Sequence, residues 1–289
     1  MIQRWLLLIS CCAAIQCAVA APVSTAASGL AAVTAARDTF RTQIGGGNVA
    51  GANGSFGGVR REINWDGVPD ARSAPNNLPA DFFNVNSPRG AVFSTPGTGF
   101  QVSATAASGT PVRFGNINAT YLTTFVTFSP ERLFTALGSN ITDVTFFLPG
   151  TATPATVSAF GAVFTDVDNA NTTSIQFFDT ANNSLGTFFV PPSGGDVSFL
   201  GVIFDGGERV SRVRITSGNV ALLPNDSPPA ADVVAMDDFL YSEPLVLLSA
   251  PRQPPLPIPA LHPAGLALIA LIVTGLAALG IRRRRSTSR

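Results

Sequence analysis

The feature that most constrains the fold is a series of short hydrophobic runs between Glu62 and Tyr241. Each run is rich in β-branched and aromatic residues and is separated from the next by glycine, proline, asparagine or serine. Such runs are typical of antiparallel strands, and their even spacing favours two stacked sheets over an α/β fold. We therefore predict an all-β fold, an antiparallel β-sandwich of jelly-roll-like or lectin-like type. The eleven predicted strands are residues 62–65, 91–94, 100–104, 122–128, 143–148, 158–165, 174–179, 186–190, 198–204, 209–216 and 233–241.

One of these runs clearly shows the two-residue period of a half-buried strand. In residues 209–216, Val213 and Ile215 point to one face, and Arg212 and Arg214 point to the other. One face of this strand should therefore be buried and the other exposed to solvent, as in an antiparallel sheet with one solvated side.

The sandwich domain is predicted to cover residues 59–243. Residues 21–58 are rich in alanine and glycine, with weak helical character at their start, and are expected to be a flexible lead. Within the sandwich, residues 130–138 are predicted to form one short helix capped by Ser129. Residues 244–257 carry many prolines and few charges, which predicts a stiff, extended spacer.

Residues 1–20 have the organisation of a secretory signal peptide. Arg4 supplies the positive start, an apolar stretch follows, and the segment ends in a small-x-small pattern. Cleavage is therefore expected between Ala20 and Ala21. Lipidation at Cys11 and an uncleaved N-terminus are the alternatives.

The other end of the chain predicts a membrane-spanning segment. Residues 264–281 form an apolar run without charge, which is about the minimum length of a transmembrane helix. A block of arginines follows it and should stay in the cytoplasm by the positive-inside rule, which places everything upstream outside the membrane. The block consists of Arg282, Arg283, Arg284 and Arg285.

The order of short motif, apolar helix and arginine cluster resembles the tripartite sorting tails of the bacterial PEP-CTERM class. The closest variant is IPTL-CTERM, whose motif reads Ile-Pro-Thr-Leu-Ser-x-Trp-Gly. Ala260, His262 and Ala264 replace its threonine, serine and tryptophan, and the Pro-Glu-Pro of the parent class is absent. The resemblance implies recognition by an exosortase-type membrane protease, removal of the helix, and release or transfer of the body to the cell surface. A permanent single-pass anchor is the alternative. The matching positions are Ile258, Pro259, Leu261 and Gly265.

Composition narrows the chemistry that the exported body can perform. Charged residues make up 12% of the chain, and five of the 18 basic residues, all of them arginine, lie in the last eight positions. The body is therefore mildly acidic, which argues against nucleic acid or an anionic membrane surface as a partner. Residues 21–257 contain no Cys, His or Lys. This excludes disulfides, His-assisted nucleophiles, histidine-ligated zinc and lysine Schiff bases in the body.

Paired carboxylates are the enzymatic option that remains. A glycosidase needs two carboxyl groups about 5–10 Å apart, and Trp65 beside Glu62 and Asp66 could stack against a sugar ring. No spacing singles out a pair, so the simpler interpretation is that these charges are solvated strand-end and turn residues.

A first acidic cluster, after the run at 158–165, points to calcium. If the backbone is extended there, Asp166 and Asp168 share one face, and Asn171 follows shortly after. Two carboxylates held close together repel each other unless a proton or a cation lies between them. Calcium takes six to eight oxygens, readily from Asp, Asn and backbone carbonyls. An Asx-rich turn without metal is the alternative.

A second acidic pair, Asp237 and Asp238, lies inside the last predicted strand. Regular alternation places them on opposite faces, so that one of them faces inward or lies at the rim. By analogy with β-sandwich modules whose first and last strands hold a calcium ion, Asp66 could join this pair. The alternative is an edge strand with hydrogen-bonded carboxylates.

Taken together, these features predict an exported bacterial protein associated with the cell surface or the extracellular matrix. Its expected role is structural or adhesive binding, with extracellular polysaccharide as the expected ligand and no catalysis. The alternative is a secreted carbohydrate-active enzyme that uses paired carboxylates on a lectin-like fold.

Overall fold

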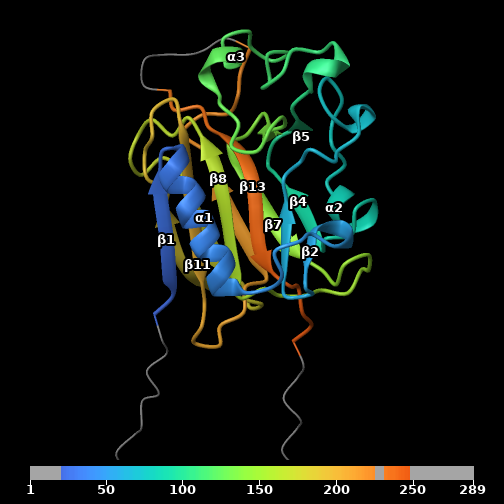
Figure 1. Cartoon of the computed structure of the whole chain (residues 1–289), viewed down its shortest axis with the longest axis vertical. Coiled ribbons are helices and arrows are strands. Elements are labelled where there is room, and N and C mark those ends of the chain that lie inside the picture. Colours follow the sequence, from blue (N-terminus) through green and yellow to red (C-terminus); the bar gives the residue numbers. More distant parts are fainter. Residues whose placement is uncertain (1–20, 225–230, 248–289) are drawn as a thin grey trace, which may run out of the picture. The chain divides into compact units, whose positions relative to one another are not determined.

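The computed structural model describes residues 21–224 and 231–247. In it, two antiparallel sheets pack face to face, and helix α1 (Leu30–Ile44) covers the outer face of the larger sheet (Figure 1). The predicted all-β sandwich is confirmed at this level. Both ends of the described body, at Ala21 and Leu247, lie at the same end of the sheets (Figure 1).

The larger sheet has eight strands in the order β1-β11-β8-β13-β3-β2, with β6 also paired to β13 and β5 paired to β6. All of these pairs are antiparallel. The last strand in the chain, β13, is therefore central in this sheet. The strands are β1 (Val23–Ser28), β2 (Ser55–Phe56), β3 (Arg60–Ile63), β5 (Gly99–Val102), β6 (Phe134–Leu137), β8 (Ala159–Thr165), β11 (Val197–Ile203) and β13 (Ala235–Ser242).

The smaller sheet has five antiparallel strands in the order β10-β9-β12-β7-β4. In β12 the two valine and isoleucine positions are buried while the arginines beside them are half-exposed, as the alternation predicted. The strands are β4 (Ala91–Ser94), β7 (Ile141–Phe146), β9 (Ser174–Phe178), β10 (Ser184–Phe189) and β12 (Arg212–Thr216). The short helical segments of the chain are η1 (Ala52–Gly54), η2 (Asp70–Arg72), α2 (Phe82–Val85), η3 (Ala106–Ser108) and α3 (Tyr121–Thr124).

The core between the two sheets is built largely from phenylalanine. Trp65 is buried at its centre, stacked on Phe134 with ring centroids 4.1 Å apart and packed edge-on against Phe239. Burying one large aromatic side chain stabilises a fold by roughly 1.5–3 kcal/mol. This aromatic cluster therefore replaces the disulfides that the body lacks.

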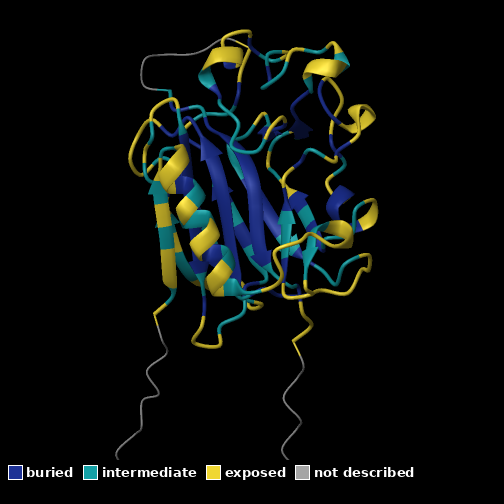
Figure 2. Ribbon diagram, viewed as in Figure 1, coloured by how far each residue is buried: buried dark blue, intermediate teal, exposed yellow. Residues whose placement is uncertain are grey.

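The central strands of the larger sheet are buried on both faces (Figure 2). In β8, Phe160 and Phe164 point into the core between the sheets, whereas Ala159 and Val163 point toward α1. From the helix, Phe40 reaches this second layer and lies edge-on to a phenylalanine of β11, with 5.7 Å between ring centroids. A strand covered on both faces reads as a continuous apolar run rather than an alternating one.

The flexible lead predicted for residues 21–58 is wrong over much of its length. Strand β1 pairs with β11 along all six of its residues, and α1 then packs against the sheet. Val33 and Phe40 are fully buried, and Ala36 and Ile44 pack beside them, which is the i, i+3, i+7 spacing of one helix face. Alanine-rich composition hid this face, because alanine adds little contrast between an apolar and a polar side.

The strand predicted at residues 122–128 is also wrong. Its start belongs to the helical turn α3, and its end is tied down by side chains instead of a neighbouring strand. The backbone N–H of Val126 donates to Thr165 Oγ1 at 3.0 Å, and the N–H of Phe128 donates to Asp237 Oδ2 at 2.7 Å. Because side chains satisfy these donors, the segment needs no sheet partner.

The helix predicted at residues 130–138 is wrong for a different reason. Residues 134–137 form β6, which pairs with β5 along its length and meets β13 where Phe134 faces Met236. Phe134 is fully buried in the aromatic core. Burial of this ring in a sheet overrides the weak local preference for helix.

Strand β13 contains a β-bulge that decides where its two aspartates point. The register against β8 shifts between Met236 and Phe239, so that Asp237 and Asp238 together oppose Val163. Met236 and Phe239 both face the core between the sheets, which leaves both aspartates toward the helix side. The predicted placement on opposite faces is therefore wrong. Of the alternative, the edge position is wrong because β13 lies between β8 and β3, whereas its hydrogen-bonded carboxylates are confirmed.

Within residues 21–224 and 231–247, no helix is both long enough and apolar enough to cross a membrane. The predicted signal peptide and the predicted sorting tail lie outside the described residues, as do Ala20, Ile258, Pro259, Leu261, Gly265 and the arginine block.

Candidate binding groove

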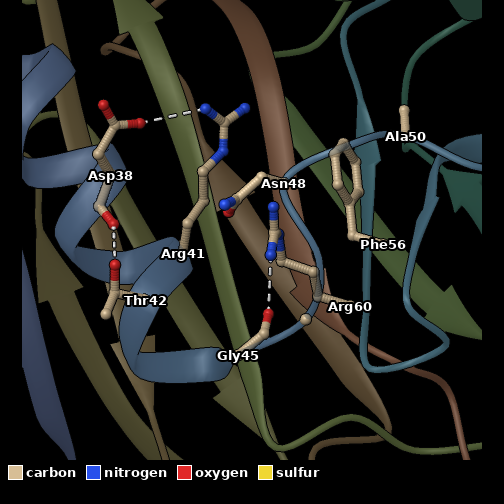
Figure 3. A pocket seen from close by; sticks show the side chains of 9 residues that line it. Asp38, Arg41, Thr42, Gly45, Asn48, Ala50, Phe56 and Arg60 are labelled. Atoms are coloured by element: carbon tan, nitrogen blue, oxygen red, sulfur yellow. Dashed lines mark hydrogen bonds and ion pairs between the residues drawn. The ribbon is translucent and has the colours of Figure 1, made fainter.

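A groove lined by arginine lies between α1 and the segment that leads into β3. It consists of two adjoining hollows of about 700 Å³ and 470 Å³ that share Arg41, Ala50 and Phe56. We call these two hollows together the arginine groove. Figure 3 shows Arg41, Asn48, Arg60 and Phe56 gathered around the larger hollow. The smaller hollow is lined by Arg37, Arg41, Ala50, Gly51, Asn53, Gly54, Phe56, Glu62, Asn64, Ser87, Arg89, Ser129 and Asp238.

Helix α1 supplies one wall through residues one turn apart. Arg37 and Arg41 are four residues apart and therefore share a helix face, and both contact Asp38. The Arg37 Nη2 to Asp38 Oδ1 distance is 2.9 Å, and the Arg41 Nη1 to Asp38 Oδ1 distance is 3.1 Å (Figure 3). The buried Phe40 on the sheet side fixes the helix, so these arginines face the groove and not the core.

Glu62 of β3 joins the two walls. Arg41 donates to both of its carboxylate oxygens, at 2.8 Å and 2.5 Å, and Arg60 Nε donates to Oε1 at 2.9 Å. Arg60 also donates to the Gly45 carbonyl at 2.8 Å and lies over the Phe56 ring at 4.3 Å (Figure 3). Since two arginines share one carboxylate, the charge at this point is positive.

Two glycines allow the glycine-rich segment to pack tightly against Phe56, Glu62 and Arg89. Gly54 has φ +62°, and a Cβ atom there would lie 2.3 Å from the Glu62 carbonyl oxygen and 2.5 Å from Arg89 Nε. Gly46 has φ +101°, and a Cβ there would lie 2.5 Å from the Phe56 carbonyl oxygen. Both positions need glycine for conformation and for space. The glycine-rich stretch is thus a wall of the groove.

Asp238 lines the smaller hollow and is linked to Asp237 through the Ser129 hydroxyl. Asp237 accepts hydrogen bonds from the backbone N–H groups of Phe128 and Ser129, at 2.7 Å and 3.3 Å. The Ser129 hydroxyl lies 3.0 Å from Asp237 Oδ1 and 2.7 Å from Asp238 Oδ1. A hydroxyl has one proton to donate, so one carboxyl of the pair is satisfied when it carries a proton of its own.

Burial of both carboxyl groups, and the charge of Asp238 acting on Asp237, favour a proton on this pair. Burial and the charge of Asp238 raise the pKa of Asp237 well above its ordinary value, against the hydrogen bonds from Phe128 and Ser129. Burial likewise raises the pKa of Asp238, against Ser129, Asp237 and Arg37. Through these hydrogen bonds the pair holds the loop at 128–129 against the sheet.

The calcium candidates after β8 form a turn organised by a residue that the sequence analysis did not select. Asp232 is fully buried, and its carboxylate accepts hydrogen bonds from the backbone N–H groups of Asp168 and Asn169, at 3.1 Å and 3.3 Å. Asp166 and Asn171 both have φ of +67°, the left-handed region that Asp and Asn tolerate best. This geometry matches the Asx-rich turn interpretation.

Burial, followed by the charge of Asp232, raises the pKa of Asp168. The predicted ligands fall in two settings, with Asp166, Asp168 and Asn171 in this turn and Asp237 and Asp238 in the bulge. In residues 21–224 and 231–247, no three His, Cys, Asp or Glu side chains lie together with the spacing of a metal site. The carboxyl groups of Asp166, Asp237 and Asp238 accept hydrogen bonds from N–H or hydroxyl groups, and calcium stays a prediction.

Trp65 and Asp66 do not form the sugar platform considered from the sequence. Trp65 is only 1% exposed, and its indole N–H donates to the Asp237 carbonyl at 2.6 Å. Asp66 Oδ1 accepts hydrogen bonds from the N–H groups of Glu131 and Arg132, at 2.7 Å and 3.2 Å. Both residues therefore fasten the 128–132 loop, Trp65 through the core and Asp66 at the surface.

The sequence analysis missed the arginines of the groove. The spacing of Arg37 and Arg41 was the one available signal, since residues four apart on a helix share a face. That Arg37 and Arg41 lie near Arg60 and Arg89 depends on the tertiary packing of three separate segments. Comparison with protein-family models, with curated proteins and with solved structures finds no match for this chain.

Proposed function

We propose that this chain is an exported bacterial protein of the cell surface or extracellular matrix that binds extracellular polysaccharide in the arginine groove, without catalysis. The observation that carries this proposal is the groove itself. Its two hollows, about 700 Å³ and 470 Å³, fall in the size range of ligand sites, and they open along one face of the body.

The lining of the groove suits sugar hydroxyl groups. Asn48, Asn53 and Asn64 carry amides that both donate and accept hydrogen bonds, and the arginines add fixed donors. Phe56 adds a half-exposed aromatic ring. A polymer of hydroxyl-bearing rings needs this mixture of donors, acceptors and flat apolar surface, repeated along a groove.

The proposed location rests on the two ends of the chain. A signal peptide cleaved between Ala20 and Ala21 would start export, and a transmembrane helix at 264–281 would hold the chain until an exosortase-type protease acts. Because both ends of the described body lie at one end of the sheets, a tether there would leave the sides of the sandwich accessible. Within the all-β class, a jelly-roll-like or lectin-like relationship remains part of this proposal.

Binding of the full chain to immobilised polysaccharides tests the proposal, with the protein purified in a non-glycosidic detergent. We expect retention on at least one bacterial exopolysaccharide, weakened in Asn48→Ala and Asn53→Ala. Asn183→Ala serves as the control, because this asparagine lies in a surface turn where it contacts Asp179. Retention that is equal for all variants would place binding elsewhere. Mass spectrometry of the mature protein from cells tests both predicted processing sites.

A second candidate function, glycoside hydrolysis, is favoured by two carboxyl groups that line one hollow. Glu62 is paired with Leu240 across the sheet, and Asp238 lies two positions before Leu240. By sheet geometry their Cβ atoms are about 7 Å apart. Asp238, with its raised pKa, could act as an acid. Release of reducing ends from a polysaccharide, abolished in Asp238→Asn, would favour the enzyme.

A further inference from the structure

Arg89 is the unusual cation of the arginine groove because it has no carboxylate partner. Its Nε donates to the Glu62 carbonyl oxygen at 2.9 Å, and its Nη1 donates to the Ser87 hydroxyl. The guanidinium lies over the Phe83 ring at 5.0 Å. Among the described residues, no Asp or Glu side chain forms an ion pair with it.

The rest of the groove does not supply the missing charge. Arg37, Arg41 and Arg60 already share the carboxylates of Asp38 and Glu62. The remaining acid is Asp238, which forms no ion pair with an arginine among the described residues. Four arginines therefore face three carboxyl groups, and the groove carries excess positive charge within a mildly acidic body.

Contacts with the surrounding protein also hold Arg89 in place where it lines the smaller hollow. Gly54 lies against its Nε, at a distance that leaves no room for a side chain. The carbonyl oxygen of Arg89 accepts the Tyr241 hydroxyl at 3.0 Å, which fixes the backbone. Burial, followed by the nearby charge of Arg61, lowers the pKa of Arg89, against the opposing effect of Tyr241. A half-buried cation has lost part of its hydration, and an anion that pairs with it compensates for this loss.

We infer that the arginine groove selects acidic polysaccharide, and that Arg89 binds the carboxylate of a uronic acid unit. This inference rests on the proposed function of the groove. Two N–H groups of the guanidinium have protein acceptors, and a guanidinium carries five. The remaining N–H groups present the planar fork that matches a carboxylate. Asn53, Asn64 and Ser129 lie around the same hollow and provide hydrogen bonds to the ring hydroxyls.

The neighbouring arginines extend this selection along a chain. Arg60 lines the larger hollow, and Arg41 lines both hollows. Both arginines are half-neutralised by Glu62 and add a weaker attraction for the next acidic unit. Because the attraction is electrostatic, affinity for an acidic polymer falls as salt concentration rises.

The test compares two forms of one polymer, so that charge is the only difference. Binding of the full chain, in a non-glycosidic detergent, is measured with polygalacturonate oligomers and with their methyl esters. We expect the acid form to bind at least about 10-fold more tightly, as for a charged hydrogen-bonded pair. Arg89→Gln should reduce this acid-to-ester ratio to near 1, Arg89→Lys should reduce it partly, and Arg72→Gln should leave it unchanged. Arg72 is exposed and lines neither hollow.

Each outcome separates this inference from the proposed function. Equal binding of acid and ester overturns the acid selection and leaves a groove that binds neutral polysaccharide. A ratio that persists in both Arg89 variants overturns the assignment to Arg89. Absence of binding to these oligomers, to dextran and to dextran sulfate overturns the proposed function with it. Tighter binding of dextran sulfate than of polygalacturonate overturns the assignment of a carboxylate as the group that Arg89 binds. A melting curve for each variant identifies unfolding, and the acid-to-ester comparison on the unaltered protein stands without any variant.

Discussion

Two surfaces of this body carry clustered arginines, and they differ in how the charge is neutralised. On the outer face of the smaller sheet, Arg212 and Arg214 flank Asp143 of the adjacent strand, with contacts of 3.0 Å and 2.7 Å. Arg212 also lies over Phe178 at 3.7 Å and donates to Asn182 at 2.6 Å. In the arginine groove, by contrast, Arg37, Arg41 and Arg60 share the carboxylates of Asp38 and Glu62, and Arg89 forms no ion pair among the described residues. Each arginine of the first surface therefore has a carboxylate partner in the protein, whereas Arg89 of the second surface lacks one and is suited to a ligand.

The origins of the two surfaces differ as well. The pairing on the smaller sheet comes from regular antiparallel register, because Arg214 stands directly opposite Asp143. The groove comes from irregular features: a helix packed on a sheet, a glycine-rich wall and a bulge in the last strand. Regular structure pairs its own charges, and irregular structure leaves charges exposed to a partner.

Removing the anchor of the helix wall should have the largest effect. Phe40→Ala deletes a fully buried ring that packs on Phe199, and we expect a loss of about 3–5 kcal/mol of unfolding free energy. Urea unfolding followed by Trp65 fluorescence measures this loss. Phe189→Ala, at a half-exposed site in the smaller sheet, should change stability by less than about 0.5 kcal/mol. Similar losses at both sites would mean that α1 is not part of the folded body.

The two charge clusters should respond differently when their carboxylate is neutralised. Glu62→Gln leaves Arg60, whose side chain is 4% exposed, without its counter-charge, and we expect a cost of about 2–4 kcal/mol. Asp143→Asn affects more exposed arginines and should cost about 1 kcal/mol or less. The same urea unfolding measurement compares them. A larger cost for Asp143→Asn would reverse our account of which cluster is structurally sensitive.

The bulge pair predicts a stability that falls as pH rises. Since folding raises the pKa of Asp237 and Asp238, the folded state binds more protons than the unfolded state. The contribution of the pair is complete below the unfolded pKa of about 3.9 and is lost as pH rises through the elevated folded values. Asp238→Asn should therefore gain stability relative to wild type between pH 4 and the folded pKa, by about 1.4 kcal/mol for each pK unit removed.

Asp179, in the smaller sheet's half of the sandwich, should contribute a pH dependence of stability with the opposite sign, and it serves as the control. Hydrogen bonds from the Asn183 side chain and backbone lower the pKa of Asp179. Its contribution is present above the unfolded pKa and is lost as pH falls through the lowered folded value. Asp179→Asn should therefore lose stability relative to wild type as pH rises through this lower range. The same trend in both variants would contradict a specific role for the bulge.

Calcium should produce the smallest effect. If Asp166, Asp168 and Asn171 bind calcium through the turn after β8, adding calcium raises the melting midpoint of the full chain and a chelator lowers it. Asp168→Asn should reduce that response, whereas Asp179→Asn should not. An unchanged midpoint with calcium and with chelator would end the calcium prediction.

Strand positions could be predicted from the sequence where burial follows a simple period. The run at 91–94 matches β4, and the Val213 and Ile215 alternation matches the buried face of β12. Segments 122–128 and 130–138 could not be predicted, because long-range contacts with Asp237 and with β13 decide their conformation. The bulge was hidden for the same reason, since nothing local to Asp237 and Asp238 marks an extra residue.

The candidate site was harder to predict from the sequence than the fold. Its acidic members, Glu62 and Asp238, stood out as charges beside hydrophobic runs, but the arginines around them come from α1, from β3 and from the loop before β4, and Arg41 lies 21 residues from Glu62. Arg89 in particular becomes noticeable only when its missing carboxylate is seen in three dimensions. Contacts between distant segments determine a groove of this kind, and periodicity does not report them.

Hydrogen exchange of the full chain with and without polygalacturonate tests the central claim most directly, because it locates the bound polymer on one of the two arginine surfaces. We predict slower exchange of backbone amides in residues 46–62 and 87–89, and unchanged exchange in β7 and β12. Protection confined to β7 and β12, or protection of neither surface under conditions in which the polymer binds, would contradict the account.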